Sequence, residues 1–513
     1  MSKKRKTAVI ILTVLILLAL AALGTVLYIK KNAPPGEEWI SYHNDEVIDM
    51  IDRQLEGLDA EKIVQEKEAY VIEKNIQEIQ EAVKDEKLSY EELTAIYLYR
   101  IKTLDQCEKG YNSVIAVNPD AIAEARRKDE YRRQNPETAS ELYGIPVMLK
   151  DNINTADLPT SAGAAAFSDF YPSEDAGLVK ALKDNGAIIL GKNNLSEFAY
   201  YVSNIMPAGY SGSKGQTTNP FGPLKISPSG SSSGSAVAVT ANLAPISIGT
   251  ETDGSIAAPS AMNSVVGFKP SRGSLPGDGI FPLIKKLDAA GPIAKCVSDA
   301  AVAYNSMSGA GLSLNFDRDA LNGRTIGLLS YEYNDRQMLS ELKDQLQEAG
   351  AKVVEVDIDT AGISVFNNIS LTFKEDFETY TQAFGFPVTS LESLLEYNRE
   401  DPVRRIRYGQ NLLEEAARIE TADWSEIDKS IQKADEVLQN AFDEYRLDAL
   451  VFLNSSGTTA PAAAGYPELT VPLGSDKKDT PQGATFAVRF GEDEKLLNLG
   501  YSFEYHTRGR LIP

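Results

Sequence analysis

The chain has 513 residues, of which 43% are hydrophobic and 24% are charged, and its formal net charge is −22 at pH 7. This length and this apolar content fit a large globular α/β enzyme with an ample core. The acidic balance argues against nucleic acid as a partner, because basic surfaces bind the phosphate backbone. Such acidity is equally consistent with a simple role in solubility.

The N-terminal residues predict a membrane anchor. Residues 1–7 form a basic tail, and residues 8–29 form an apolar run without charges, long enough for the roughly 20 residues that cross a bilayer as a helix. A secretory signal peptide has a shorter apolar core, of about 7 to 15 residues. We therefore expect an uncleaved transmembrane signal anchor, with the rest of the chain outside the cytoplasm. If the segment is cleaved, the protein is secreted.

Residues 30–45 include Pro34, Pro35 and Gly36 and predict a stalk, so that one domain occupies residues 46–513. The charged stretch from 60 to 84 predicts helices packed on the body, because its apolar spacing is too patchy for a coiled coil. The run Ser89-Tyr90-Glu91-Glu92 is typical of a capping box that opens a helix.

Helical patterns followed by apolar strands recur along the chain, at residues 178–190 and again at 339–356. This alternation predicts an α/β fold with a largely parallel or mixed central sheet flanked by helices. Residues 360–445 read as helical. Their candidates for the walls of a pocket are Phe366, Leu371, Tyr380, Phe384 and Phe386, although aromatic side chains at such positions more often belong to the core.

Histidine and cysteine are scarce. A Ser-His-Asp triad would depend on His506 alone, since the other histidine, His43, lies in a charged N-terminal stretch. Cys107 and Cys296 leave little for a zinc site, and we expect no metal and no cofactor. The two cysteines allow one disulfide, but we expect two unpaired, buried thiols.

Two loops of small residues, 229–235 and 250–255, flank an apolar segment at 236–243. Glycine and serine runs are often flexible linkers. Here the loops adjoin apolar segments instead of polar sequence, which favours backbone that approaches a ligand closely. A loop rich in free N–H groups at the start of a helix is suited to hold an anion or an oxyanion.

A serine hydroxyl in these loops needs a base to become a nucleophile. With histidine scarce, the candidate base is Lys150, which ends the apolar, strand-like run 144–149. Burial there would lower its pKa from about 10.4, as a general base requires. The alternative is an ordinary surface lysine at the end of a strand.

Three segments resemble the amidase signature family of Ser-Ser-Lys amide hydrolases. They read GIPVMLKDN at 144–152, PSGSSSGS at 228–235 and GTETDGSI at 249–256. The resemblance covers residues 70–513 and implies a single large amidase-signature domain with its core motifs at 144–270. It assigns Lys150 as general base, Ser231 as the bridging serine, usually after a cis peptide bond, and Ser255 as the nucleophile that forms the acyl-enzyme. It also implies an oxyanion hole from the N–H groups of Thr252, Asp253, Gly254 and Ser255.

The chain departs from the family pattern at four positions. Ser229, Ser233 and Asp253 stand where glycines are usual, and Ala257 stands where many members have arginine. The motifs TETDGSI (250–256) and GSSSGS (230–235) resemble those of the peptide amidase branch, whose members remove C-terminal amides from peptides. The resemblance therefore implies a peptide or small-molecule amide as substrate. We expect Ser232 and Ser233 to be loop hydrogen-bonders and not catalysts.

Two other functions stay open. The first is a glutaminase-type A subunit of a tRNA-dependent amidotransferase, against which the predicted anchor and the acidic charge argue. The second is a non-catalytic binding protein on the same scaffold, against which the intact Lys150, Ser231 and Ser255 argue. The sequence leaves the oligomeric state undetermined.

Overall fold

The structure is a computed structural model that describes residues 35–135 and 140–513. All features below belong to the unit Glu37–Pro513. The anchor predicted at 8–29 lies outside the described residues. Within the described ranges, no helix combines the length and the apolar character needed to cross a membrane.

Among the described residues, eleven strands form one mixed sheet, in the order β1-β3-β2-β6-β8-β7-β12-β13-β11-β9-β10. The strands are β1 (Val114–Val117), β2 (Pro146–Lys150), β3 (Ile188–Asn193), β6 (Ile246–Glu251), β7 (Val266–Lys269), β8 (Ala289–Ala294), β9 (Thr325–Leu329), β10 (Lys352–Val356), β11 (Ala449–Leu453), β12 (Glu468–Ser475) and β13 (Pro481–Ala487). Strand β2 is parallel to β3 and β6, and β9 is parallel to β10 and β11, whereas the other neighbours are antiparallel. The predicted mixed sheet is confirmed. A short hairpin, β4 (Tyr210–Ser211) with β5 (Gly215–Gln216), lies apart from it.

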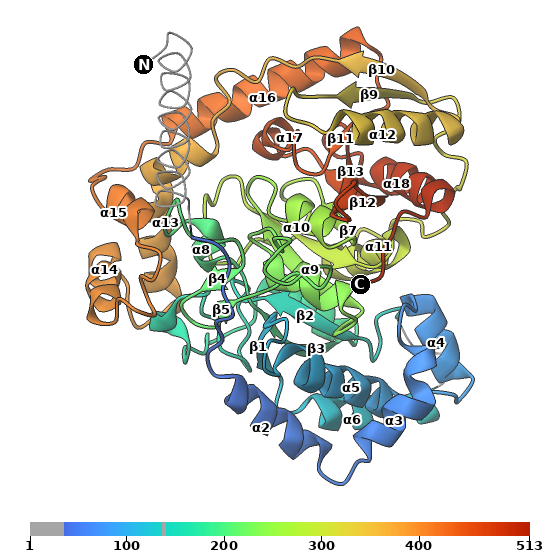
Figure 1. Ribbon diagram of the computed structural model, residues 1–513, viewed down its shortest axis with the longest axis vertical. Coiled ribbons are helices and arrows are strands. Elements are labelled where there is room, and N and C mark those ends of the chain that lie inside the picture. The colour runs from blue at the N-terminus through green and yellow to red at the C-terminus, as the bar shows by residue number, and fades with distance from the viewer. Residues whose placement is uncertain (1–34, 136–139) are drawn as a thin grey trace, which may run out of the picture. The chain divides into compact units, whose positions relative to one another are not determined.

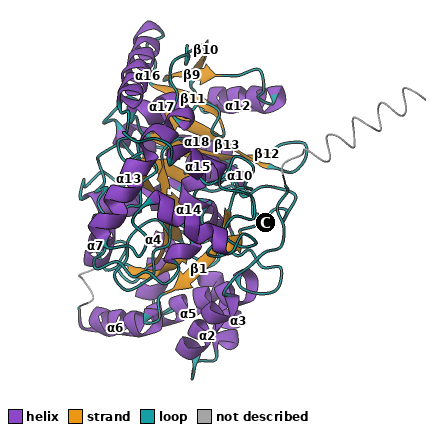
Figure 2. Ribbon diagram, turned by 90° about the vertical axis from the view of Figure 1, so that its left-hand side faces the viewer, coloured by secondary structure: helices purple, strands orange, loops and turns teal. Residues whose placement is uncertain are grey.

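Helices cover both faces of the sheet (Figure 2). Helices α11 (Val297–Ser308) and α18 (Asp493–Thr507) pack together over β8 and β12, and α9 (Ser233–Thr240) and α10 (Ala257–Met262) pack on the other face. Alternation along β7 sets the two faces, because Phe268 joins the core under α11 while Gly267 faces α10. A Cβ at Gly267 would lie 2.2 Å from Ser260 Oγ, so glycine is what allows α10 to approach the strand.

The N-terminal helices form a layer beside β1 and β3 (Figure 1). They are α2 (Asn44–Leu55), α3 (Ala60–Lys67), α4 (Ile76–Lys84), α5 (Tyr90–Arg100) and α6 (Ala121–Gln134). The capping box before α5 is confirmed, since Glu92 N donates to Ser89 Oγ and Ser89 N donates to a Glu92 carboxylate oxygen. Within the predicted stalk, residues 40–42 hydrogen-bond to residues 214–216, and α2 begins directly afterwards.

The remaining helices include a group that follows β10 and lies on one side of the body (Figure 1). That group is α13 (Ile369–Phe384), α14 (Leu391–Glu400), α15 (Asn411–Ala416) and α16 (Ser425–Glu444). Three other helices precede β10, namely α7 (Gly177–Asp184), α8 (Glu197–Tyr200) and α12 (Arg336–Glu348), and α17 (Thr459–Ala464) follows β11. Of the candidate pocket residues, Phe386 belongs to the core and Phe366 is exposed. Tyr380 and Phe384 line a cavity described below.

Both cysteines are free thiols, as expected. The expected burial is wrong for Cys107, which is exposed, and Cys296 is only partly buried. Cys107 lies in a surface turn between Gln106 and Glu108, directly after the helical segment Ile101–Asp105 ends.

Candidate active site

Lys150 is the last residue of β2, and its side chain is fully buried. Because β2 and β6 run parallel, their carboxyl ends meet at one edge of the sheet, where Lys150 faces Thr250. The lysine Nζ lies 2.7 Å from Ser231 Oγ, 2.9 Å from Thr250 Oγ1 and 3.1 Å from the Thr250 carbonyl oxygen. Asn152 Nδ2 donates to the same Thr250 hydroxyl over 3.0 Å.

Burial lowers the pKa of Lys150 to about 7, because the ammonium form loses its hydration. The charges of Asp288 and Glu251 partly oppose this shift. No described carboxylate forms an ion pair with Lys150, in contrast to Lys192, whose Nζ lies 3.3 Å from Asp151. With a pKa of about 7, the Lys150 side chain is in large part a neutral amine near neutral pH.

Ser231 lies in the loop that leads into α9 and is fully buried, and the peptide bond between Gly230 and Ser231 is cis. The flanking serines hold this loop in place, as expected. Ser232 Oγ donates to the Thr250 carbonyl oxygen over 3.1 Å, and Ser233 Oγ donates to the carbonyl oxygen of Ser229. The loop is thus fixed against the end of β6.

Ser255 is 8% exposed, and its hydroxyl forms no hydrogen bond with a described residue. Its carbonyl oxygen accepts a 3.2 Å hydrogen bond from Ser232 N, which places the two loops side by side. The structure therefore brings Lys150 and Ser231 into direct contact. It brings Ser255 to their loop through the backbone, without a hydrogen bond between the two serine hydroxyls.

The four backbone N–H groups from Thr252 to Ser255 donate no hydrogen bond within the described part of the chain. Gly254 adopts φ +80°, a left-handed conformation that glycine accommodates without strain. Successive free amides next to a hydroxyl form a cradle suited to a negatively charged oxygen. This loop can accept an oxyanion without breaking an existing hydrogen bond.

Two carboxylates that the sequence reasoning did not assign fix this loop. Glu251 Oε2 accepts from the N–H groups of Ile256 (2.7 Å) and Ala257 (2.9 Å), which come directly after Ser255. Asp288 accepts the hydroxyl of Thr252. Glu251 lies inside the GTETDGSI motif and could have been considered, whereas no local pattern distinguishes Asp288.

Asp253 is a loop-shaping residue in this structure. Its two carboxylate oxygens each accept a 2.9 Å hydrogen bond, one from Thr458 Oγ1 and one from Thr459 Oγ1. Burial raises the pKa of Asp253 to about 6 despite these two donors. The side chain is thereby tied to the N-terminal end of α17, about 200 residues further along the chain.

His506 lies away from this site. Its Nε2 is 3.1 Å from the Arg318 carbonyl oxygen and 3.7 Å from Asp319, on the surface of α18. A triad that uses His506 is therefore not formed with the serines of either loop.

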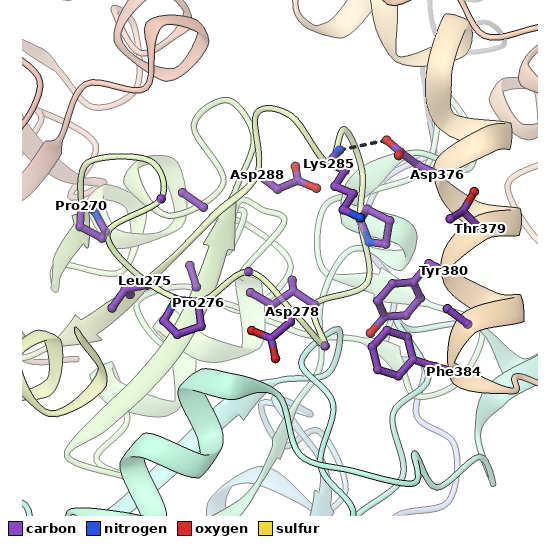
Figure 3. A pocket seen from close by; sticks show the side chains of 18 of the residues that line it. Pro270, Leu275, Pro276, Asp278, Lys285, Asp288, Asp376, Thr379, Tyr380 and Phe384 are labelled. Atoms are coloured by element: carbon purple, nitrogen blue, oxygen red, sulfur yellow. Dashed lines mark hydrogen bonds between the residues drawn. The ribbon is translucent and has the colours of Figure 1, made fainter. Parts of the chain in front are cut away.

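A cavity of about 410 Å³ lies next to the site, between residues 270–290 and α13 (Figure 3). Asp288 is shared by the cavity wall and the loop at Thr252. Lys150, Ser231 and Ser255 do not line it. The cavity is therefore a neighbour of the serine and lysine cluster, joined to it through Asp288.

Comparison with known proteins shows that the chain is similar to amidases in both sequence and structure. The Amidase family model matches residues 92–497. A protein of Arabidopsis thaliana named "Probable amidase" is 35% identical over 477 residues, covering 86% of this chain and 91% of the plant protein.

Two solved structures are also similar. An amidase family protein from Bacillus anthracis is 39% identical, covers 94% of this chain and 100% of its own, and has a TM-score of 0.90. The peptide amidase of Stenotrophomonas maltophilia is 35% identical, covers 86% of this chain and 98% of its own, and has a TM-score of 0.79. The family match spans most of the chain, including all the residues of the site. The chain belongs to the amidase signature family and is an amidase.

Proposed function

We propose that the protein hydrolyses carboxamide bonds, with C-terminal amides of peptides as the favoured substrate class, through an acyl-enzyme on Ser255. The observation that carries this proposal is the 2.7 Å contact between the buried Lys150 Nζ and Ser231 Oγ. A base, a bridging hydroxyl and a free nucleophilic hydroxyl then come from three separate motifs. This arrangement is the Ser-Lys variant of triad chemistry.

The partners of Lys150 support its role as a base. A neutral amine has two N–H bonds and one lone pair, and Nζ has three neighbouring oxygen atoms. The Thr250 carbonyl oxygen can only accept, and the Thr250 hydroxyl is oriented to accept from Nζ as well. If the two N–H bonds point to Thr250, the lone pair is left facing Ser231. Thr250 is then a positioning residue that aims the base.

In the proposed acylation, Lys150 Nζ takes the proton of Ser231 Oγ, and Ser231 Oγ takes the proton of Ser255 Oγ. The Ser255 oxygen forms a bond to the carbonyl carbon of the amide. The carbon–nitrogen bond then breaks as Ser231 Oγ gives one proton to the leaving nitrogen, which departs as ammonia or an amine, and Lys150 Nζ returns a proton to Ser231 Oγ. Water repeats the sequence on the ester to release the acid.

This sequence requires the Ser231 and Ser255 hydroxyls to form a hydrogen bond when substrate is bound. Contacts of this kind often tighten only in the complex with substrate. The free amides of residues 252–255 supply the oxyanion hole in this proposal. A single donor of this type lowers a barrier by about 3 kcal/mol.

The substrate class is supported by the likeness to the peptide amidase of Stenotrophomonas maltophilia and by the TETDGSI motif, which resembles the peptide amidase branch. The absence of the usual arginine at Ala257 supports a substrate range different from that of general amidases. From residues 1–29 we further propose that the enzyme acts at the outer face of the cell membrane, or as a secreted protein if the segment is cleaved. Recovery of the full chain in the soluble cytoplasmic fraction would contradict this location.

The test of function is ammonia release by the full chain from a panel of C-terminally amidated peptides, beside simple aliphatic and aryl amides. Ser255→Ala and Lys150→Ala are assayed in parallel. Release that stops in both variants supports the proposal, and mass spectrometry of trapped enzyme should show an acyl group on Ser255 only. Activity that survives Ser255→Ala refutes the mechanism. A requirement for a partner chain would favour the glutaminase-type subunit, and no turnover of any amide would favour a binding protein.

A further inference from the structure

The cavity beside the active site has features of a ligand site in its own right. One wall is the loop of residues 270–290, and the opposite wall is the C-terminal half of α13 (Figure 3). Its volume of about 410 Å³ lies within the range that small-molecule sites occupy, about 300 to 1,000 Å³. No step of the proposed hydrolysis uses its lining.

Three carboxylates line the cavity. Asp376 is only 6% exposed and has one oxygen occupied, because Oδ2 accepts from Lys285 N over 2.9 Å. Its other oxygen has no hydrogen-bond partner among the described residues. Asp288 closes one end of the cavity, and Asp278 lies exposed on its loop wall. Burial raises the pKa of Asp376 to about 7, so a positive charge brought beside it would be stabilised.

A second polar group points into the same space. The Tyr380 side chain is 9% exposed, and its hydroxyl approaches Asn154 without the geometry of a full hydrogen bond. In Figure 3 this hydroxyl projects from α13 toward the side of the cavity where Asp278 lies. An orphaned hydroxyl is costly in a buried setting unless a ligand or water satisfies it.

The rest of the lining suits an organic cation with an apolar stem. The Tyr380 and Phe384 rings lie 4.6 Å apart between centroids and form an aromatic wall, a surface that attracts ammonium groups. Apolar side chains complete the walls, and they are Leu275, Pro276, Ile280, Pro282 and Ala383. One cation, Lys285, lines the cavity; it is exposed and outside ion-pair distance of Asp376, although its charge lowers the pKa of that carboxyl. The net charge of −22 favours the approach of cations from a distance.

We propose that this cavity binds an alkylammonium ion, with the ammonium group held by the unpaired oxygen of Asp376 and the stem against the apolar wall that includes the Tyr380 ring. Two sources share this chemistry, namely a free aliphatic amine and the basic side chain of an amide substrate. The substrate side chain as the source rests on the proposed function, whereas the binding of an alkylammonium ion does not.

Calorimetric titration of the full chain with n-pentylammonium chloride at pH 8 tests the binding, with 1-pentanol as the neutral match. We expect the ammonium ion to bind at least tenfold more tightly than the alcohol. Asp376→Asn keeps an acceptor for Lys285 N and should weaken ammonium binding at least fivefold, and Tyr380→Phe should weaken it less. The matched control is Asp428→Asn, which removes an exposed carboxylate outside the lining and should change nothing.

Equal binding of the alcohol and the ammonium ion, or unchanged binding in a folded Asp376→Asn variant, would overturn the proposal. Thermal unfolding of each variant confirms that the comparison is made on folded protein. The titration is independent of turnover, so an inactive enzyme that binds pentylammonium separates failure of the proposed function from failure of this site.

Peptide amides that carry lysine or norleucine at one position identify the source. A lysine preference in kcat/KM that falls at least fivefold in Asp376→Asn assigns the site to the substrate side chain. A lysine preference that does not change in Asp376→Asn, although the same variant has lost pentylammonium binding, assigns the site to a free amine.

Discussion

The backbone N–H of Ser232 donates a 3.2 Å hydrogen bond to the carbonyl oxygen of Ser255, which joins the loop of the bridging serine to the loop of the nucleophile. Ser232 Oγ reaches the Thr250 carbonyl oxygen in the same region, and that oxygen also faces Lys150. One residue between two candidate catalytic serines therefore couples both loops to the base. The geometry of the site is therefore set by one main-chain hydrogen bond together with the side chain of Ser232.

Replacing the buried lysine should remove the base without a large change of shape. Lys150→Met keeps an unbranched side chain of similar length, and general base catalysis contributes about 10²- to 10⁴-fold to rate. We expect kcat for amide hydrolysis to fall within that range. The exposed Lys180→Met on α7 serves as the control and should retain full activity. A Lys150→Met enzyme with normal kcat would exclude the lysine as base.

The activity should depend on pH through the same group. The pKa of Lys150 is lowered to about 7 by burial, and only the neutral amine can accept a proton. We expect kcat/KM to rise with pH up to about 7 and to level off above it. The folded state also binds fewer protons than the unfolded state between pH 7 and 10.5, so this group adds stability as pH rises through that window. Stopped assays from pH 5 to 9 give the profile, and an acid limb near pH 5 would point to another group.

Glu251 should act as a positioning residue for the nucleophile. Its carboxylate accepts from Ile256 N and Ala257 N, and loss of a charged acceptor leaves both buried donors unpaired. We expect Glu251→Ala to lower kcat at least tenfold with little change in KM, and Glu251→Gln to recover part of the loss through its carbonyl oxygen. Equal kcat in the alanine and glutamine variants, both folded by circular dichroism, would contradict the role.

The tie between Asp253 and the N-terminal end of α17 should contribute to stability. Thr458→Val removes one of the two hydroxyl donors to this carboxylate, and leaving a buried acceptor unsatisfied costs about 1–3 kcal/mol. We expect the free energy of unfolding to fall by about that amount at pH 8. The loss should be smaller at pH 5, because the pKa of Asp253 is raised to about 6 and the neutral acid needs the donor less. Urea titrations at both pH values measure this difference, and an equal loss at both would count against it.

The predictable part of the site is the part encoded in short runs of sequence. The strand that ends at Lys150 is an unbroken apolar run, and a central parallel strand buried on both faces has that appearance. The loops at Ser231 and Ser255 are each carried by one contiguous motif. In contrast, Thr458 and Thr459 meet Asp253 only because β12 and β13 bring the C-terminal segment beside β7, which no local pattern reveals. Cys107 was placed wrongly for a related reason, since burial of a single small thiol is decided by the surrounding turn.

The order of strands in the sheet has a consequence for synthesis on the ribosome. Strand β7 pairs with β8 and β12, and β9 pairs with β10 and β11, so the two parts of the sheet meet only through β12 and β13. Until residues 449–487 have emerged, the nascent chain carries two open strand edges, at 266–269 and at 325–329. Open strand edges can pair with other chains. Because the last strands complete this sheet, the two open edges must be protected from such pairing until translation is complete. A chain that stops before β11 therefore yields an aggregating fragment and not a smaller enzyme.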